Sequence, residues 1–447
     1  MKKNIKYVIL FILFFLVMIY FYIPFRMDTY VNYAFTYGIV NGQIPYKDFN
    51  MIVPALSPFI YSILLIFNKS MLTYYIEQSI LLVLFSSCLF KLLDKKAWII
   101  ITSLFCPIIF CFTYSIFPGY NFILLFELIL LILLEDKYKE KDYLIGIIAS
   151  LTILTKHNIG IFIYLIAIIY PFLKNKNIKQ TIKRFLYSLI PLILYLIYLL
   201  LTKSLYSFID YCFLGINEFK NNFQLDILYL ILVIISVIIM AIKYIKSKDK
   251  NISYYYLLAY LPVIYPLVEE YHVSLFLLFC FIVFIYNTKI KTPKRIPIYS
   301  FIVIISFISI YYFLGKDYYK KLHLYPYHNF QVEFINKKTK NDYDEIIKFS
   351  KDKKIIVIDY QKVVFFSAVR DKKLTKQFIP LRGNLGSKGV KGLLKSIENE
   401  HDVYYLVEND YYCRNNNCQL DPRVYQKIKN NYELVMKLNY FSIYYKE

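Results

Sequence analysis

The carboxylate of Asp28 stands at a position where it could do chemistry. Asp28 comes three residues after the first long apolar run, Tyr7 to Phe25. That run is long enough to cross a hydrocarbon core, so Asp28 is expected at a membrane surface, where a carboxylate is costly unless it has a partner or a function. It could act as a general base that takes a proton from a hydroxyl. It could equally be an N-cap, because the aromatic, amphipathic stretch Thr29 to Val40 follows it.

A second acid lies in the same polar interval, residues 26–58. Asp48 belongs to the segment Ile-Pro-Tyr-Lys-Asp-Phe, which also contains Tyr46. Asp48 could be a second carboxylate of the site, a metal ligand, or an ion-pair partner of Lys47 or Arg26. We favour a structural or substrate-positioning role, because ion pairs in exposed loops are common and weak.

Two further polar clusters interrupt the apolar runs. Lys156 and His157 lie at one junction, where a lysine can bind an anion as a point charge or can simply extend its ammonium group to the membrane surface. Glu269, Glu270 and His272 lie at another junction. They could form a hydrated loop, but His272 begins an apolar run, and ionisable groups within a membrane are usually functional.

A glycine-rich turn, Arg382 to Gly389, enters a predicted helix near the C-terminus. A turn of this kind could hold a phosphate at the helix N-terminus. It matches neither a P-loop nor a dinucleotide-binding fingerprint, so we favour a plain glycine-rich helix cap. The chain also lacks HExxH, paired CxxC and GxSxG motifs, so metalloprotease, serine hydrolase and ATPase functions have no motif support and no metal site is predicted.

Seven cysteines are present, and most lie in or next to apolar runs, where a thiol usually packs as a small hydrophobic group. Cys413 and Cys418 are the one pair with a spacing that suggests a bond. They could close a small disulfide loop if their domain lies outside the cell. A zinc site is less favoured, because no second pair of ligands is nearby.

The elements that must position these residues are membrane helices. The chain is 58% hydrophobic and 19% aromatic, which is typical of a mainly α, polytopic membrane protein. The short run 55–67 is flanked by prolines and is expected to be interfacial or re-entrant. We expect about eleven spans, near residues 7–25, 72–92, 97–113, 120–134, 143–155, 158–173, 185–202, 225–242, 252–268, 272–287 and 298–314.

The charges between these runs predict the orientation. Most loop lysines and arginines fall in every second loop, beginning with the N-terminal Lys2, Lys3 and Lys6. The positive-inside rule therefore predicts a cytoplasmic N-terminus. The net charge of +22 would suggest nucleic acid in a soluble chain. Here the positive residues act as topology signals, so no nucleic-acid partner is predicted.

The composition changes after residue 314. Residues 1–314 form the predicted transmembrane domain, with residues 26–58 as its first external loop. Residues 315–447 alternate between predicted helices and strands, which suggests a small α/β domain. Strands are expected at 354–360 and 403–408, one or two strands at 433–445, and helices at 344–351, 362–370, 388–399 and 422–431. The number of spans places this domain outside the cell.

The arrangement resembles the GT-C superfamily of glycosyltransferases that use lipid-phosphate sugars, the group of protein O-mannosyltransferases and aminoarabinose transferases. An aspartate follows the first span, and Gly42-x-x-Pro45-Tyr46-x-Asp48-Phe49 follows an interfacial helix. The segment Leu154 to Gly160 is similar to an LTK-x-x-x-G segment common in this group. The Gly-Asn-Leu-Gly turn and the Glu-Glu-x-His stretch resemble those of a bacterial subgroup with an external C-terminal domain.

The resemblance implies a polyprenyl-phosphate-linked sugar as donor and an envelope glycan, lipid or protein as acceptor. Asp28 would be the catalytic base of an inverting transfer, and Lys156 and His157 would stabilise the phosphate leaving group. Tyr46, Asp48, Glu269, Glu270 and His272 are further candidates for substrate binding. Many relatives carry an acid in the second outer loop, whereas residues 113–121 have none, so the need for a divalent metal stays open.

Other classes remain as alternatives. A lipid-linked-sugar transporter or flippase, or a polysaccharide polymerase, would share the many spans, but a transporter is expected to show internal repeats and charged groups near mid-membrane. An envelope scaffold with a membrane anchor would not need so many spans. The richness in Ile, Lys, Asn and Tyr suggests a bacterial source, and we expect the chain in the cytoplasmic membrane with its C-terminal domain outside.

Overall fold

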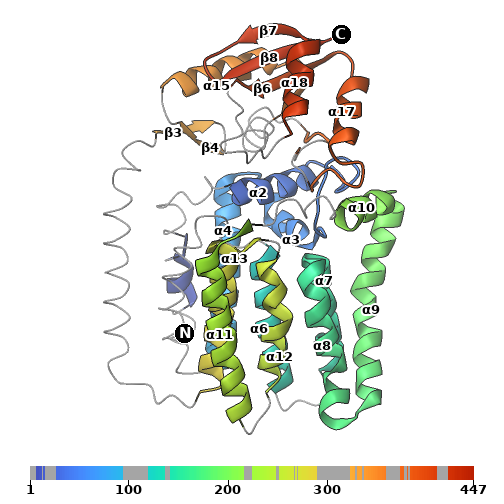
Figure 1. Ribbon diagram of the computed structural model, residues 1–447, viewed down its shortest axis with the longest axis vertical. Coiled ribbons are helices and arrows are strands. Elements are labelled where there is room, and N and C mark those ends of the chain that lie inside the picture. The colour runs from blue at the N-terminus through green and yellow to red at the C-terminus, as the bar shows by residue number, and fades with distance from the viewer. Residues whose placement is uncertain are drawn as a thin grey trace.

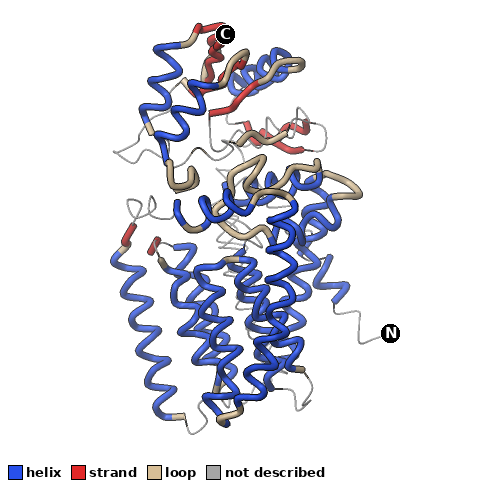
Figure 2. Tube along the Cα trace, turned by 90° about the vertical axis from the view of Figure 1, so that its right-hand side faces the viewer, coloured by secondary structure: helices blue, strands red, loops and turns tan. Residues whose placement is uncertain are grey.

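The structure is a computed structural model, and most of it is helical (Figure 1). Helices run side by side in a bundle, and the β-strands lie almost entirely beyond one end of it (Figures 1 and 2). We call the end of the bundle that faces the C-terminal sheet the upper end. The residues that the structure describes are 7–12, 14–15, 27–93, 119–135, 141–215, 224–247, 251–265, 267–268, 270–288, 323–327, 330–334, 337–358, 373–376, 380, 383–409 and 421–447.

Most helices of the N-terminal part follow the predicted apolar runs, whereas α2 follows the amphipathic stretch Thr29 to Val40 and α10 was not predicted. The short run 55–67 forms a short helix, α3, and its interfacial or re-entrant position stays a prediction. The run 252–268 forms a helix, a 3-10 turn and a short strand. The elements are α2 (Met27–Val40), α3 (Leu56–Leu65), α4 (Met71–Leu93), α6 (Gly119–Glu135), α7 (Asp142–Thr155), α8 (His157–Asn175), α9 (Ile178–Leu201), α10 (Leu205–Cys212), α11 (Ile227–Lys246), α12 (Ile252–Tyr260), η4 (Leu261–Ile264) and α13 (Glu270–Tyr286).

Four of the described helices are long and apolar enough to cross a membrane, at Leu72–Leu93, His157–Asn175, Ile178–Leu201 and Ile227–Lys246. Five shorter apolar helices accompany them. The predicted spans 97–113 and 298–314 lie outside the described residues, and the span 7–25 is described only at 7–12 and 14–15. The structure therefore agrees with a helical membrane protein, while the total of eleven spans and the orientation stay predictions.

Helices α9 and α11 show what surrounds the bundle. Only 17% of the apolar window of α9 and 11% of that of α11 are buried against other parts of the chain. Large side chains such as Leu194 and Ile234 are half-exposed. A soluble protein rarely exposes a continuous apolar surface of this size, whereas a hydrocarbon environment accommodates it.

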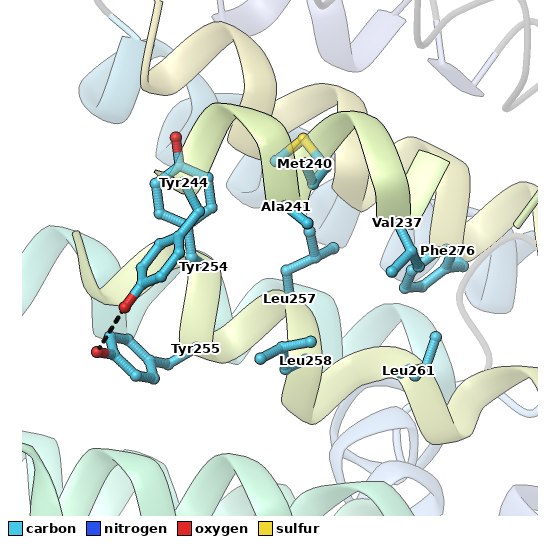
Figure 3. A pocket seen from close by; sticks show the side chains of 10 residues that line it. All are labelled: Val237, Met240, Ala241, Tyr244, Tyr254, Tyr255, Leu257, Leu258, Leu261 and Phe276. Carbon is cyan, nitrogen blue, oxygen red and sulfur yellow. Dashed lines mark hydrogen bonds between the residues drawn. The ribbon is translucent and has the colours of Figure 1, made fainter. Parts of the chain in front are cut away.

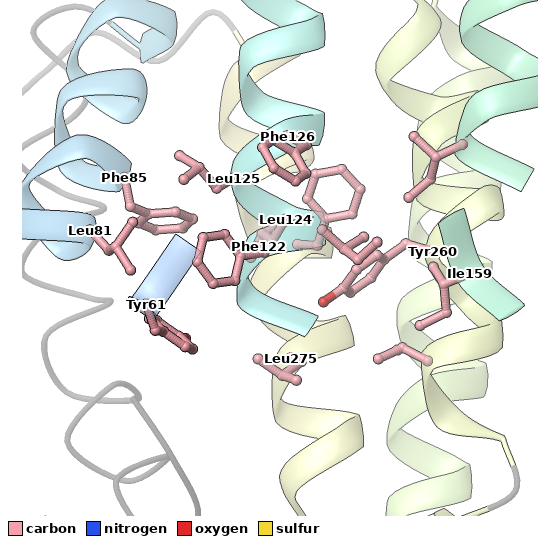
Figure 4. Close-up of a cluster of buried hydrophobic side chains, with 14 of the residues drawn as sticks. Tyr61, Leu81, Phe85, Phe122, Leu124, Leu125, Phe126, Ile159, Tyr260 and Leu275 are labelled. Carbon is pink, nitrogen blue, oxygen red and sulfur yellow. The ribbon is translucent and has the colours of Figure 1, made fainter. Parts of the chain in front are cut away.

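Aromatic side chains fill much of the space inside the bundle (Figure 4). Tyr61 of α3 contacts Phe122 of α6, with ring centroids 5.4 Å apart. Tyr260 of α12 packs against Phe279 of α13 at 5.3 Å. All four side chains are almost completely buried. These contacts fix the height of α3 relative to α6 and that of α12 relative to α13.

Two glycines allow close approach of helices α7, α8 and α9. A Cβ atom on Gly146 would collide with the Arg184 carbonyl oxygen, and one on Gly160 would collide with the Thr152 carbonyl oxygen. The Thr152 hydroxyl also donates a hydrogen bond of 3.0 Å to the Gly160 carbonyl. The glycine of the Leu154 to Gly160 segment therefore has a packing role.

Replacing Gly160 with alanine is expected to force α7 and α8 apart and to lower stability by about 1–3 kcal/mol. The matched control is Gly119→Ala, because a Cβ there would lie 3.7 Å from its nearest neighbour, an ordinary contact. Thermal unfolding of both variants in detergent micelles tests this. An unfolding midpoint for Gly160→Ala equal to that of the control would contradict the packing role.

The C-terminal residues form a small α/β unit, as predicted. Its sheet has the order β5-β6-β8-β7, in which β5 and β6 are parallel and the other pairs antiparallel. Ile356, Ile358, Tyr405 and Val407 belong to its buried core. The elements are α15 (Lys337–Ser350), β5 (Ile355–Ile358), α17 (Gly389–Asn399), β6 (Val403–Glu408), α18 (Pro422–Asn431), β7 (Glu433–Lys437) and β8 (Phe441–Lys446).

Some strands were not expected, and two other predictions cannot be compared with the structure. A hairpin of β3 (His323–Tyr327) and β4 (Phe330–Phe334) precedes the sheet and was not expected from the sequence. Strands β1 (Gln224–Leu225) and β2 (Leu267–Val268) also form a short parallel pair at the upper end of the bundle. The predicted helix 362–370 and the pair Cys413 and Cys418 lie outside the described residues.

Candidate functional site

Two of the predicted site residues meet at Tyr120, the second residue of α6. The Lys156 ammonium nitrogen lies 3.3 Å from the centroid of the Tyr120 ring, a cation–π contact. The Tyr120 hydroxyl and His272 Nε2 form a hydrogen bond of 3.1 Å. The three residues come from α6, the α7–α8 junction and α13, all at the upper end of the bundle (Figure 1). We call Tyr120, Lys156 and His272 the upper cluster.

A local break in the chain places Lys156. Its extended backbone (φ −154°, ψ 96°) ends α7 and starts α8, so the two helices turn back on each other at this residue. The break leaves the N-terminus of α8 at the upper end, with Lys156 as its N-cap residue. A helix N-terminus carries partial positive charge, so both groups favour an anion at this position.

His157 lies next to Lys156 but faces another neighbour. Its ring contacts Phe213, with centroids 4.9 Å apart, and lies beside the backbone of Cys212. Phe213 in turn packs on Phe208 at 5.6 Å, and Phe208 packs on Tyr46 at 5.1 Å. His157 therefore connects the upper cluster to the loop between α2 and α3 through a row of aromatic rings.

Tyr46 is completely buried and has a left-handed backbone, with φ 68°. Its hydroxyl donates to the Val53 carbonyl at 2.9 Å and forms a second hydrogen bond of 2.8 Å with the Tyr195 hydroxyl. The Tyr195 hydroxyl also accepts a hydrogen bond from the Ala55 amide. Burial raises the pKa of the Tyr46 hydroxyl, so it stays neutral. These contacts indicate that Tyr46 holds the loop in shape, and its contact with substrate stays a prediction.

Asp48 closes a turn of the same loop. Its carboxylate accepts a hydrogen bond of 2.7 Å from the Ile44 amide, and its own amide donates to the Ile44 carbonyl at 2.9 Å. The residue is half-buried, whereas Lys47 is exposed. The carboxylate therefore stabilises this turn, and a role of Asp48 in positioning substrate stays a prediction.

The other predicted acids are placed only by their backbones or lie outside the described part. Asp28 is the second residue of α2, so it belongs to the first helical turn and does not precede it. Helix α2 lies across the upper end of the bundle (Figure 1). Glu270 is the first residue of α13, above His272. Glu269 lies outside the described residues.

The glycine-rich turn Arg382 to Gly389, described from Gly383 onwards, contacts the bundle. The Asp210 carboxylate, at the upper end after α9, accepts hydrogen bonds from the Ser387 amide, at 3.0 Å, and from the Ser387 hydroxyl. The left-handed φ of +70° at Gly386 permits this turn. The anion that occupies the turn is therefore a carboxylate of the protein itself.

Contacts of two side chains join the loop between α2 and α3 to the C-terminal part. The Gln43 side chain donates to the Leu374 carbonyl and accepts from the Leu374 amide, both at 2.8 Å. The Asn50 side chain donates to the Asn384 carbonyl at 2.8 Å. All three hydrogen bonds are buried. The loop between α2 and α3 is thus held between the bundle and the C-terminal part.

Replacing Asp210 with alanine is expected to loosen the glycine-rich turn. The lost bonds lie at the surface, so the cost is about 1 kcal/mol, or about fivefold faster hydrogen exchange at the Ser387 amide. Hydrogen exchange measured by mass spectrometry checks this. The control is Asp226→Asn, since the Asp226 carboxylate caps α11 elsewhere and asparagine also caps helices. Unchanged exchange at residues 383–389 in Asp210→Ala would show that Asp210 does not hold the turn.

Several polar residues of the bundle were not among the predicted site residues. Glu127 of α6 is fully buried, and neither of its carboxylate oxygens has a hydrogen-bond partner among the described residues. Glu77 of α4 is 5% exposed, and one of its carboxylate oxygens, Oε2, has no hydrogen-bond partner among the described residues. Each is a lone acid within an apolar run, and that signal was available in the sequence. Tyr120 carried no signal, because tyrosine occurs 48 times in this chain.

No family model, curated protein or solved structure matches the chain. In the part of the chain that the structure describes, no three His, Cys, Asp or Glu residues gather as metal ligands. The fold is compatible with a helical membrane protein that has its polar cluster at one end.

Proposed function

We propose that this chain is a membrane glycosyltransferase. It would transfer a sugar from a polyprenyl phosphate to an envelope glycan, lipid or protein at the outer face of the bacterial cytoplasmic membrane. The observation that supports this most is the upper cluster, in which Lys156 and the N-terminus of α8 offer positive charge at one end of the apolar bundle. A lipid phosphate in the membrane could reach this position while its chain stays in hydrocarbon.

The reaction would be a single displacement with inversion. An acceptor hydroxyl attacks the anomeric carbon, and its proton passes to the Asp28 carboxylate as the new carbon–oxygen bond forms. The bond from the anomeric carbon to the phosphate oxygen breaks, and the polyprenyl phosphate leaves with the bonding pair. Lys156 would stabilise the charge that develops on this phosphate. His272 and Tyr120 would position the lysine, because the Tyr120 ring contacts its ammonium group and His272 holds the Tyr120 hydroxyl.

Replacing Lys156 with glutamine is expected to lower kcat/KM for sugar transfer by about 100-fold or more, because a group that stabilises the leaving phosphate is removed. The assay uses purified protein in liposomes with a panel of polyprenyl-phosphate sugars and envelope acceptors, with and without EDTA. Lys47→Gln is the matched control, since Lys47 is exposed on the first loop, and it should stay within about twofold of wild type. Equal rates for Lys156→Gln and wild type would contradict the role of Lys156.

A lipid-linked-sugar transporter is the second candidate, and one observation favours it. Glu77 and Glu127 are buried carboxyl groups within the bundle, and such groups are typical of transport pathways. If the chain is a transporter, labelled lipid-linked sugar should cross the liposome bilayer without forming a new glycosidic bond, and Glu127→Gln should slow this crossing. If it is a transferase, Glu127→Gln should leave sugar transfer within a few-fold of wild type.

A further inference from the structure

A narrow cavity lies between α11, α12 and α13, in a different place from the upper cluster. Its volume is about 200 Å³. The side chains around it are apolar except for the tyrosine hydroxyls, and Figure 3 shows them on facing helices. They are Val237, Met240, Ala241, Tyr244, Tyr254, Tyr255, Leu257, Leu258, Leu261 and Phe276.

The cavity is an elongated slot along α11. From Val237 to Tyr244 the helix rises about 10 Å, at 1.5 Å per residue. Leu258 is 61% exposed on one wall and Ala241 is exposed on the other, so the slot opens at the outer surface of the bundle. Only 11% of the apolar window of α11 is buried against other parts of the chain. The slot on this helix therefore faces the hydrocarbon of the membrane.

The end of the slot farthest from the C-terminal sheet is polar. The Tyr244 and Tyr255 hydroxyls form a hydrogen bond of 3.3 Å there (Figure 3). Lys246, in the last turn of α11, is exposed at the same end. Lys174, in the last turn of α8, lies 5.6 Å from the Tyr170 ring centroid, also at this end. Tyrosines and lysines at one level mark the boundary between hydrocarbon and head groups.

We propose that this slot binds one acyl chain of an anionic phospholipid from the leaflet farthest from the C-terminal domain. The shape and apolar lining fit a hydrocarbon chain that runs parallel to the helices. The chain enters from the lipid, since the slot faces hydrocarbon. The phosphate of the head group would then lie near Lys246 and Lys174, and basic residues at the membrane surface attract anionic lipids. This inference does not depend on the glycosyltransferase proposal, because the head-group end lies at the opposite end of the bundle from Lys156.

Bound lipid tests the proposal directly. The full chain is reconstituted in nanodiscs of phosphatidylglycerol and phosphatidylcholine, released in mild detergent, and analysed by native mass spectrometry. The wild type is expected to retain one phosphatidylglycerol in preference to phosphatidylcholine. Leu258→Trp fills the slot from α12, and Ala241→Leu fills it more mildly from α11. Both should lower the retained lipid by about fivefold or more, and Lys246→Gln should reduce the preference for phosphatidylglycerol several-fold.

The matched control is Ile235→Trp, which adds the same side chain to a half-exposed position of α11 that does not line the slot. It should retain lipid like the wild type. If Leu258→Trp misfolds, Ala241→Leu decides the result. Equal retention in Ala241→Leu and wild type, equal retention of the two phospholipids, or retention of a polyprenyl phosphate instead would each overturn the proposal.

Discussion

Replacing Asp28 with asparagine is expected to lower sugar transfer by about 100-fold or more, because general-base catalysis contributes about 10²–10⁴-fold to such reactions. Asparagine keeps the shape of the side chain but cannot take the proton of the acceptor hydroxyl. The measurement is sugar transfer in membranes that contain equal amounts of wild type or variant, with the polyprenyl-phosphate sugars of the host as donors. Asp28 lies in the first turn of α2, above the bundle.

The control for this experiment is Asp48→Asn. The Asp48 carboxylate accepts a hydrogen bond from the Ile44 amide, and an asparagine oxygen can do the same, so a moderate loss is expected. Protein level and topology are measured for both variants. Unchanged transfer in Asp28→Asn would move the catalytic base elsewhere, with Asp48 and Glu269 as the next candidates. If the wild type transfers no sugar from any donor, the transporter becomes the better proposal.

The largest effect on stability is expected at a buried ion pair in the lower half of the bundle. Arg184 Nε of α9 lies 2.7 Å from the Asp142 carboxylate of α7, and the two side chains are only 5% and 7% exposed. Gln180 donates a further hydrogen bond to Asp142, and Arg184 donates one to the Ala167 carbonyl of α8. The pair therefore ties α7, α8 and α9 together.

Replacing Arg184 with methionine leaves the Asp142 charge buried without its partner, and the expected loss of stability is about 3–5 kcal/mol. The double variant Asp142→Asn with Arg184→Met should recover most of this loss, because no buried charge remains. Thermal unfolding in detergent micelles measures both variants. A loss as large in the double variant as in Arg184→Met would show that the packing of Arg184, and not its charge, stabilises the bundle.

A second control uses an exposed ion pair. Lys340 and Asp344, four residues apart on α15, are 2.7 Å from each other and partly exposed. Lys340→Met should cost no more than about 0.5 kcal/mol, because solvent screens such pairs. Arg184→Met and Lys340→Met each remove the positive partner of an ion pair. The difference between their losses of stability measures the effect of burial.

Much of the layout follows from the sequence. The runs 120–134, 143–155 and 272–287 predict α6, α7 and α13 within three residues at either end, because apolar length and helix-breaking loops are local properties. The strand 403–408 and the helix 422–431 are predicted to the residue. The start of α9, at Ile178, was predicted seven residues too late, since its first two turns carry lysine and arginine and resemble a loop.

The hairpin of β3 and β4 could not be predicted from local sequence patterns. Its residues, His323 to Phe334, are rich in tyrosine and phenylalanine, which also occur in the membrane helices of this chain. Aromatic residues have a preference for strands, but neighbouring elements decide whether a strand forms. In these residues, apolar and polar side chains alternate over too short a stretch to predict a pair of strands.

The sequence by itself determined that this chain is apolar and helical and that a small α/β unit follows. It also determined which residues lie between the apolar runs. Only the tertiary structure decided which side chains of different helices contact one another. Tyr120 and His272 are 152 positions apart, and a hydrogen bond between them depends on the packing of α6 against α12 and α13. Burial of Tyr46 and Glu127 likewise depends on neighbours that are distant in the chain. Local patterns set the length and polarity of each element, whereas packing between elements sets the contacts of each side chain.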